Sequence, residues 1–247
     1  MRMRLFRRRN VRISSHARSG ATGAPHSLHA VFRSVDGGDT WNARVRGDDP
    51  RKLNTMLFTN PAYALNNECN GNPNQTQIIH QGWYNNVIAV DPLNENIVWV
   101  GGVDWFRSED GGANWGMASF WHILQRERQY VHADQHALVF HPQYDGAGNQ
   151  IMFVSNDGGV FRTDTARGQT AKGDRAPCTW TTSGIFWKPV NNGYATTQFY
   201  HGAVFPGGRA YLGGAQDNGV LIGSDERGPN GWTEILSGDG GNVEVDP

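Results

Sequence analysis

One pattern of four short strands occurs three times along the chain, and it constrains the fold more than any other feature. The first copy spans 86 to 119 and reads NVIAVDP, NIVWVGG, WFRSEDGG and NWGMAS, with each apolar run bounded by Pro, Gly or Asp. The second copy begins with HALVFHP at 136 and the third with FYHGAVFP at 199. Repeats of about 45 to 60 residues with four strands each are typical of propeller blades. We therefore predict an all-β fold, a partial β-propeller.

The repeat divides most of the chain into blades. We expect a half blade at 27–47, a long loop at 48–82, complete blades at 83–122, 130–190 and 196–237, and the first strand of a further blade at 240–247. In the blade at 130–190, a polar insertion at 165–177 precedes the fourth strand, TWTTSG at 179–184. About three and a half four-stranded blades are too few for a closed ring, which typically has four to eight. The missing blades would come from the rest of a longer native chain or from another chain.

Composition and charge agree with this fold and exclude some functions. The chain has 32 Gly, 11 Pro and 9 Trp, which favours short strands and tight turns. Six arginines lie within the first twelve residues, and without them 16 basic residues face 23 acidic ones. An acidic body argues against a nucleic-acid partner. We expect residues 1–26 to form a basic, disordered tail, with no secretory signal and no membrane span in the chain.

The two cysteines give no metal or redox motif. Cys69 and Cys178 lie far apart in the sequence and could pair if the protein is exported. No cofactor-binding motif is present, and we expect no cofactor.

An Asp-Gly-Gly triplet occurs three times in two different settings. SVDGGDTW at 34–41 and SEDGGANW at 108–115 join a third strand to a fourth, and each ends in Trp. There the Asp can accept bonds from its own turn, Gly supplies positive φ, and Trp packs into the blade. We assign a structural role to Ser34, Asp36, Gly38 and Trp41, and to Ser108, Asp110, Gly112 and Trp115.

The third triplet lies in SNDGG at 155–159, between a second and a third strand, with no Trp after it. In an up-and-down blade such loops open on the opposite face, which we call the upper face. The other second-to-third loops and the blade-to-blade loops open there too. The predicted substrate-binding residues of this face are Asp104, Trp105, His132, Asp134, His136, Asn156, Tyr200, Gln216 and Asn218, and the candidate catalytic residues are Asp157, Asp217 and Asp239. Such a collection suits a carbohydrate-type pocket.

Each of these assignments has a structural alternative. His132, Asp134 and His136 alternate and could bind a metal, but a hydrogen-bonded lining is the commoner arrangement, so we expect no metal. Asp157, Asp217 and Asp239 could each cap their own turn, as Asp110 would. The tryptophans and tyrosines beside the upper loops could stack on sugars or be buried; they are Trp83, Tyr84, Trp105, Trp121 and Tyr200.

SVDGGDTW and SEDGGANW resemble the Asp-box, or BNR, repeat of sialidases, xyloglucanases and sortilin-type propellers. VHADQHALVFHP, SNDGGVFRTD, NNGYATTQFY and GGAQDNGV look like glycosyl-hydrolase-like BNR proteins allied to glycoside hydrolase family seventy-four and sortilin. The resemblance covers 29–247.

It implies an extracellular or periplasmic protein that binds a glycan and could be an inverting hydrolase. Asp157 would pair with Asp217 or Asp239, with the carboxyls about 6.5 to 9.5 Å apart. The alternative is a non-catalytic, sortilin-like scaffold for a peptide or protein. The sialidase arginine triad is not recognisable.

Overall fold

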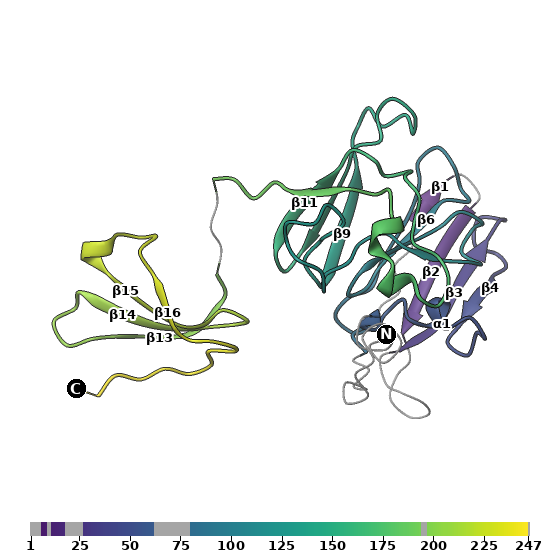
Figure 1. The fold of residues 1–247 in the computed structure, drawn as a ribbon. Helices are drawn as coiled ribbons and strands as arrows, with labels where there is room; N and C mark the ends of the chain where they lie inside the picture. The colour runs from purple at the N-terminus through teal and green to yellow at the C-terminus, as the bar shows by residue number, and fades with distance from the viewer. Residues whose placement is uncertain (1–5, 9–10, 18–26, 62–79, 194–196, 247) are drawn as a thin grey trace. The chain divides into compact units, whose positions relative to one another are not determined.

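The strands of the protein form four antiparallel sheets of four strands each, and in every sheet the strands that follow one another in the chain pair (Figure 1). The computed structural model describes residues 6–8, 11–17, 27–61, 80–193 and 197–246. The chain divides into two units, Met1–Asn191 and Asn192–Pro247, which we call unit one and unit two. The all-β class and the four-stranded blades predicted from the sequence are confirmed.

Unit one contains three of the sheets. The first consists of β1 (Phe6–Arg8), β2 (Val11–Ala17), β3 (Leu28–Ser34) and β4 (Asn42–Arg46), and is followed by the short helix α1 (Lys52–Thr55). The second consists of β5 (Val87–Val90), β6 (Val98–Gly101), β7 (Trp105–Ser108) and β8 (Gly116–Met117). The third consists of β9 (Gln135–Phe140), β10 (Met152–Asn156), β11 (Gly159–Thr163) and β12 (Trp187–Pro189), with the 3-10 turns η1 (Ala176–Cys178) and η2 (Trp180–Thr182) between β11 and β12.

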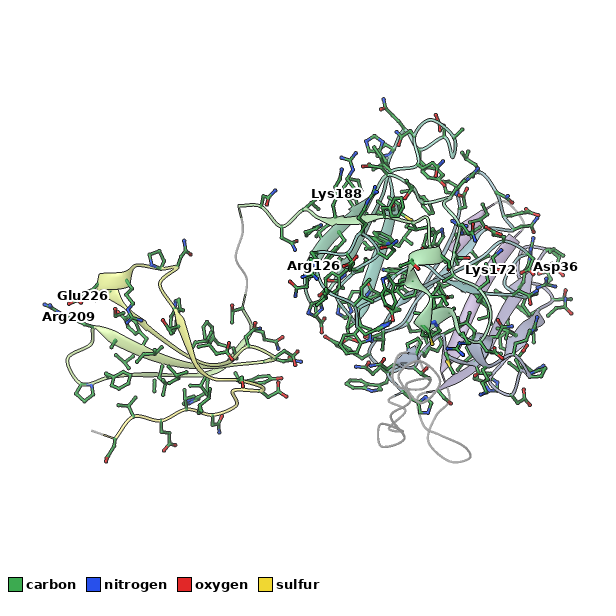
Figure 2. The ribbon with its side chains drawn as sticks, in the orientation of Figure 1. Asp36, Arg126, Lys172, Lys188, Arg209 and Glu226 are labelled. Atoms are coloured by element: carbon green, nitrogen blue, oxygen red, sulfur yellow. The ribbon has the colours of Figure 1, made fainter. Side chains whose placement is uncertain are left out.

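The second sheet is buried on both faces, which explains its continuous apolar strands. Along β5, Ile88 and Val90 pack into a core shared with Leu28 and Val31 of β3. The alternate β5 residues enter a second core, shared with Met152 and Val154 of β10. Because successive side chains of a strand point to opposite faces, a blade between two others must be apolar at every position. Charged side chains such as Asp36, Lys172 and Lys188 lie at the surface of unit one (Figure 2).

The N-terminal segment differs from the expected disordered tail. Residues 6–8 and 11–17 are β1 and β2, and β2 pairs along β3 from Arg12–Ser34 to Ala17–Leu28. The predicted half blade is therefore a complete four-stranded sheet. The physical reason is the edge of β3, whose backbone groups would otherwise lack partners. The arginines of the N-terminal segment gave no indication of this pairing in the sequence.

The fourth strand of the third sheet also differs from the prediction. TWTTSG at 179–184 contains η2 and no strand, and the strand that pairs with β11 is Trp187–Pro189. Pro177 lies inside η1, immediately before this segment, and a proline favours a turn over a ladder. Trp180 packs partly buried against the first core, whereas Trp187 is buried in the second.

Unit two is a single sheet of β13 (Phe199–Val204), β14 (Ala210–Ala215), β15 (Gly219–Ser224) and β16 (Thr233–Leu236), with the 3-10 turn η3 (Asp225–Arg227) before β16. Arg209 and Glu226 mark its surface in Figure 2. The strand expected at 240–247 is not formed in 240–246, although Val243 is buried and its carbonyl lies 2.8 Å from His201 Nδ1. A strand needs a partner ladder, and no described strand pairs with this segment. Trp232 is 37% exposed.

The predicted loop 48–82 contains α1 and lies outside the described residues from 62 to 79. Within the described part of the chain, no helix is long and apolar enough to cross a membrane. Cys69 also lies outside the described residues, whereas Cys178 is disulfide-bonded.

This disulfide leads to a simple test. The full chain, unfolded in urea without reductant, is expected to show no thiol that reacts with Ellman's reagent, and two such thiols after reduction. Two reactive thiols before reduction in freshly purified, oxidant-free protein would contradict the bond. The Cys178→Ser variant, which leaves Cys69 alone, serves as the one-thiol standard.

Candidate functional site

The loops of unit one open on two opposite ends of the sheets. Backbone N–H groups at Asp134 and Gln135, where β9 begins, donate to Val103 and Gly102 in the loop between β6 and β7. At the other end, Gly111 in the loop between β7 and β8 donates to Asn96 in the loop before β6. Asp157 follows β10, beside the start of β9. Asp110 and Asp157 therefore lie on opposite faces.

The two Asp-Gly-Gly turns of the lower face have the same hydrogen bonds. In the first, Ser34 donates to Asp36 and accepts from Gly38, Asp36 accepts from the N–H of Thr40, and the Trp41 indole donates to the Gly38 carbonyl. The second repeats these contacts with Ser108, Asp110, Gly112, Asn114 and Trp115. In both turns the two glycines have positive φ. The carboxylates of Asp36 and Asp110 thus accept their hydrogen bonds from their own turns.

The turn at Asp157 is built differently. Here Asn156, not Asp157, accepts the N–H of Gly158 at 3.0 Å. A Cβ at Gly158 would lie 2.4 Å from His132, so the glycine lets this histidine pack against the turn. The Asp157 side chain is left to face other elements, and the self-capping alternative does not apply to it.

Asp157 contacts an aromatic and an imidazole side chain from two other segments. The Tyr84 hydroxyl lies 3.1 Å from both carboxylate oxygens of Asp157 and donates to them. His136 Nε2 lies 2.5 Å from Asp157 Oδ1. The rings of Tyr84 and His136 meet edge to face at 5.0 Å, and Trp83, 62% exposed, lies 5.4 Å from Tyr84. We call Trp83, Tyr84, Asp134, His136 and Asp157 the upper cluster.

Asp134 lies in a strained and partly buried position of this cluster. Its φ is +70°, in the left-handed region that few residues other than glycine adopt. Asn85, a fully buried residue, donates to Asp134 Oδ1 at 2.6 Å. Burial raises the pKa of Asp134 above its ordinary value, and the charge of Asp157 adds to this rise. The bond from Asn85 and the nearby His132 and His136 act in the opposite direction.

Three predicted binding residues are closed to a ligand. Asp104 and Trp105 are fully buried, and Asn156 is 7% exposed. Trp105 packs edge to face on Trp99 in the second core, so it is a blade core residue and not a stacking platform. Asn156 donates to the buried Gln135. Their burial shows that the predicted substrate-binding role of these three residues is wrong. Their position near a loop in the sequence did not show that their side chains point into the protein.

Burial dominates the chemistry of Asp104. It raises the pKa of Asp104 to about 8, although the bonds from the N–H of Trp121 and the hydroxyl of Ser119 oppose the shift. At neutral pH this side chain is therefore a neutral carboxylic acid inside the protein.

The remaining predicted residues belong to unit two. The loop between β14 and β15 carries Gln216, Asp217 and Asn218, and Tyr200 is 51% exposed on β13. Asp239 accepts the N–H of Asp217 at 3.0 Å, and Asp217 has a φ of +56°. Asp239 thus orders the turn at Asp217, which differs from the expected capping of its own turn.

The alternating histidines and Asp134 do not form a metal-ligand group. Among the residues that the structure describes, no three His, Cys, Asp or Glu side chains are arranged to hold a metal ion. His132 packs on Gly158, whereas His136 contacts Asp157.

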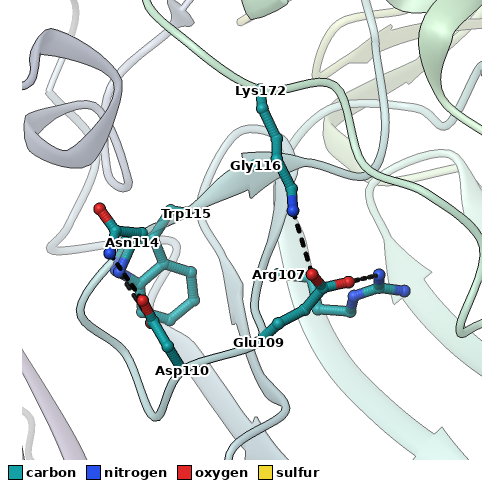
Figure 3. A pocket seen from close by; sticks show the side chains of 7 residues that line it. All are labelled: Arg107, Glu109, Asp110, Asn114, Trp115, Gly116 and Lys172. Carbon is teal, nitrogen blue, oxygen red and sulfur yellow. Dashed lines mark hydrogen bonds and ion pairs between the residues drawn. The ribbon is translucent and has the colours of Figure 1, made fainter.

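A separate cavity of about 240 Å³ opens near the lower-face turn of Asp110 (Figure 3). Glu109 lies between two cations there, accepting from Arg107 Nη2 at 2.6 Å and from Lys172 Nζ at 3.0 Å (Figure 3). Arg107 is almost fully buried and also donates to the Ala166 carbonyl. The charges of this cavity are neutralised among themselves, which is typical of a structural cluster.

Sequence reasoning missed Asn85 and the contact that Tyr84 makes with Asp157. Both residues lie immediately before β5, at the end of a long loop, where the chain enters the upper end of a blade. Strand order could have placed both residues on the upper face, because the residue that precedes a first strand must lie on the same face as the loop after a second strand.

No protein family matches the chain, and no curated protein matches it. Solved structures that resemble it include the GH74 enzyme of Niastella koreensis, with 14% identity over 92% of this chain and a TM-score of 0.41. YCF48 bound to D1 peptide resembles it with 11% identity over 85% of this chain and a TM-score of 0.21. YCF48 from Cyanidioschyzon merolae has 14% identity over 90% of this chain and a TM-score of 0.23. The chain spans 28% of the GH74 enzyme and 63% and 68% of the two YCF48 chains.

Proposed function

We propose that the protein binds a glycan chain at the upper cluster of unit one. The observation that carries this proposal is the orientation of Asp157, whose carboxylate leaves its own turn and meets Tyr84 and His136. Beside it, the exposed ring of Trp83 offers a face for the C–H groups of a sugar. The carboxylates and the imidazole offer acceptors and donors for its hydroxyl groups.

We also propose that the protein works outside the cytoplasm. The disulfide at Cys178 supports this location, because such bonds persist in oxidising compartments.

Peptide or protein binding is the second candidate function, and it would use unit two. Large apolar side chains are exposed on its two outermost strands, β13 and β16. They are Phe199, Tyr200, Val204, Ile235 and Leu236. Exposed apolar groups of this kind favour a protein ligand over a hydrated polysaccharide.

Binding of soluble polysaccharides tests the first proposal. Tamarind xyloglucan and barley β-glucan are the probes, with dextran as a second carbohydrate, and affinity gel electrophoresis or calorimetry gives the dissociation constant. Trp83→Ala is expected to weaken binding about tenfold, equivalent to about 1.4 kcal/mol. Asp157→Asn is expected to weaken it as well, because the substitution removes the negative charge and one of the two acceptor oxygens that face Tyr84 and His136.

The matched control is Trp232→Ala, which removes an exposed tryptophan from unit two. It should leave the dissociation constant unchanged. A wild-type protein that binds none of the polysaccharides, or a Trp232→Ala variant that loses binding while Trp83→Ala keeps it, would refute the proposed site. In the latter case, the peptide-binding candidate on unit two would gain support.

A further inference from the structure

We propose that unit two binds the guanidinium group of a peptide arginine in a cavity beside the turn that joins β15 to β16. The cavity has a volume of about 310 Å³. Its walls come from β14, from the end of β15 and from the turn itself; they are Tyr211, Ser224, Asp225, Gly228, Pro229 and Trp232. The inference rests on the second candidate function, because it names the side chain that a peptide ligand of unit two would present.

The sequence of this turn departs from the two Asp-Gly-Gly turns of unit one. In those turns an aspartate follows the serine by two positions and a tryptophan follows it by seven, as in SEDGGANW at 108–115. After Ser224 the second position is Glu226, and Trp232 comes eight positions later. The turn begins with η3. Its aspartate and its tryptophan form contacts with the sheet, as the next two paragraphs describe.

Trp232 packs on the sheet, whereas the tryptophans of the two turns in unit one donate to carbonyl groups of their own turns. A Cβ at Gly223 would lie 2.7 to 2.9 Å from three atoms of the Trp232 ring, so the glycine makes room for the indole. Tyr211 of β14 is the cross-strand partner of Gly223. Its ring centroid lies 6.4 Å from that of Trp232, and the two planes are tilted by 38°. Two aromatic rings therefore line the cavity at an open angle.

Asp225 brings a negative charge to these rings. The Tyr211 hydroxyl donates to Asp225 Oδ1 at 2.5 Å, and this bond raises the pKa of the phenol. Two arginines are close in the chain, but Arg227 donates to the Thr233 hydroxyl at 2.9 Å and Arg209 meets Asp225 through its backbone carbonyl. Within the described part of the chain, no Lys or Arg side chain forms an ion pair with Asp225. The cavity thus presents a carboxylate without a cation.

An arginine side chain fits both features of the cavity. Its planar guanidinium stacks on aromatic rings and donates several N–H groups to a carboxylate. An exposed ion pair alone contributes little, so the ring of Trp232 is needed beside Asp225. A lysine ammonium has a compact, strongly hydrated charge and no flat face to stack. The combination of Trp232, Tyr211 and Asp225 therefore favours arginine over lysine and over an uncharged group of the same shape.

A titration followed by NMR of the full chain tests the inference. The probe is a hexapeptide of alternating glycine and arginine, and the comparison peptides carry lysine or the uncharged isostere citrulline in place of arginine. The indole N–H signal of Trp232, assigned with Trp232→Phe, should shift saturably with the arginine peptide. Binding of the citrulline peptide should be weaker by about fivefold or more. No saturable shift up to about 10 mM, or equal binding of the lysine or citrulline peptide, would overturn the assignment.

Charge substitutions separate the cavity from the acidic surface around it. Asp225→Asn is expected to weaken binding of the arginine peptide about fivefold, although the amide oxygen can still accept from Tyr211. Glu226→Gln is the matched control, because it removes the same charge from the next residue, which lies at the surface and does not line the cavity (Figure 2). Its dissociation constant should stay within about twofold of the wild type. Equal losses in the two variants would overturn the proposed site.

Substitution of Trp232 tests the aromatic part of the site. Trp232→Ala is expected to weaken binding of the arginine peptide about fivefold, and Trp232→Phe should keep part of the affinity because it keeps a ring. The backbone N–H signals of Ser224 and Gly228 report binding in these variants, and the rest of each spectrum verifies that the chain is folded. A Trp232→Ala variant that binds as tightly as the wild type would overturn the role of the ring.

One further peptide separates this inference from the candidate function on which it rests. A peptide of alternating glycine and leucine probes the exposed apolar side chains of β13 and β16. If it shifts the signals of these strands while the arginine peptide shifts none, the arginine site is refuted and peptide binding by unit two stands. If neither peptide binds, both are refuted.

Discussion

Asp104→Asn is expected to raise the free energy of unfolding at pH 7 by about 2–4 kcal/mol. Burial raises the pKa of Asp104 to about 8 in the folded protein, whereas an aspartate in an unfolded chain has an ordinary pKa near 3.8. Each unit of difference corresponds to about 1.4 kcal/mol. Asparagine keeps an oxygen to accept from Ser119 and from the N–H of Trp121, and its amide nitrogen replaces Oδ2, which has no partner among the described residues.

The pH dependence of this gain has a definite sign. Between pH 4 and pH 8 the folded protein keeps the Asp104 proton and the unfolded chain has lost it, so raising the pH favours unfolding. The stability that protonated Asp104 supplies is fully present below its pKa in the unfolded chain. It falls as the pH rises and is lost once the pH reaches its pKa in the folded protein. Asparagine does not titrate. The difference between variant and wild type should therefore be near zero at pH 4, grow towards pH 8 and stay constant above it.

Urea unfolding at a series of pH values measures this difference. Asp48→Asn serves as the control, since it removes a carboxylate from the surface and should match the wild type within about 0.5 kcal/mol at each pH. A wild-type protein as stable as Asp104→Asn at pH 8, or a gap that shrinks as the pH rises, would show that Asp104 is ionised in the folded state.

Much of the fold could be predicted because blades repeat. The strands at 87–90, 98–101 and 105–108 follow from short apolar runs between turn residues, and burial on both faces explains why these runs do not alternate. The strands at 6–8 and 11–17 could not be predicted in this way. They contain a run of arginines, and their pairing is decided by the open edge of β3, a tertiary effect that no local pattern records.

The candidate site could be predicted only in part. Topology placed Asp134, His136 and Asp157 on one face, because strand order decides which loops meet. It did not show that Asp104 and Trp105 point into the protein, since both a buried and an exposed side chain are compatible with a loop beside a strand. It also could not show that Asn156 caps the turn and releases Asp157, because both residues are suited to that bond.

Arg167→Met is expected to lower the free energy of unfolding by about 3–5 kcal/mol at pH 7. Arg167 donates through Nε and Nη2 to Asp91, whose side chain is fully buried at the end of β5. The Tyr144 hydroxyl and the N–H groups of Leu93 and Asn94 also donate to Asp91. Methionine fills much of the same space without the charge, and a buried carboxylate that loses its cation is strongly destabilising. The contact ties the second sheet to the loops of the third, so its loss should weaken the attachment of these loops while the shared apolar core still joins the two sheets.

Asp91 gives the opposite pH dependence to Asp104. Burial alone would raise the pKa of Asp91, but the bonds from Arg167 and Tyr144 outweigh it and hold the pKa below its ordinary value. The stability from this pair is therefore present above the unfolded pKa and is lost as the pH falls through the folded one. The deficit of Arg167→Met should be largest at neutral pH and should narrow below pH 4.

Tyr144→Phe is the matched control, because it removes one donor and keeps the cation. Its expected loss is about 1.5–3 kcal/mol, the usual range for a hydrogen bond to a charged group. Urea unfolding at pH 7 and pH 3.5 measures the free energy of unfolding of both variants and of the wild type. A loss for Arg167→Met below about 1 kcal/mol, or one that is the same at both pH values, would mean that the buried carboxylate does not depend on Arg167. The two blades would then be held together by their shared apolar core alone.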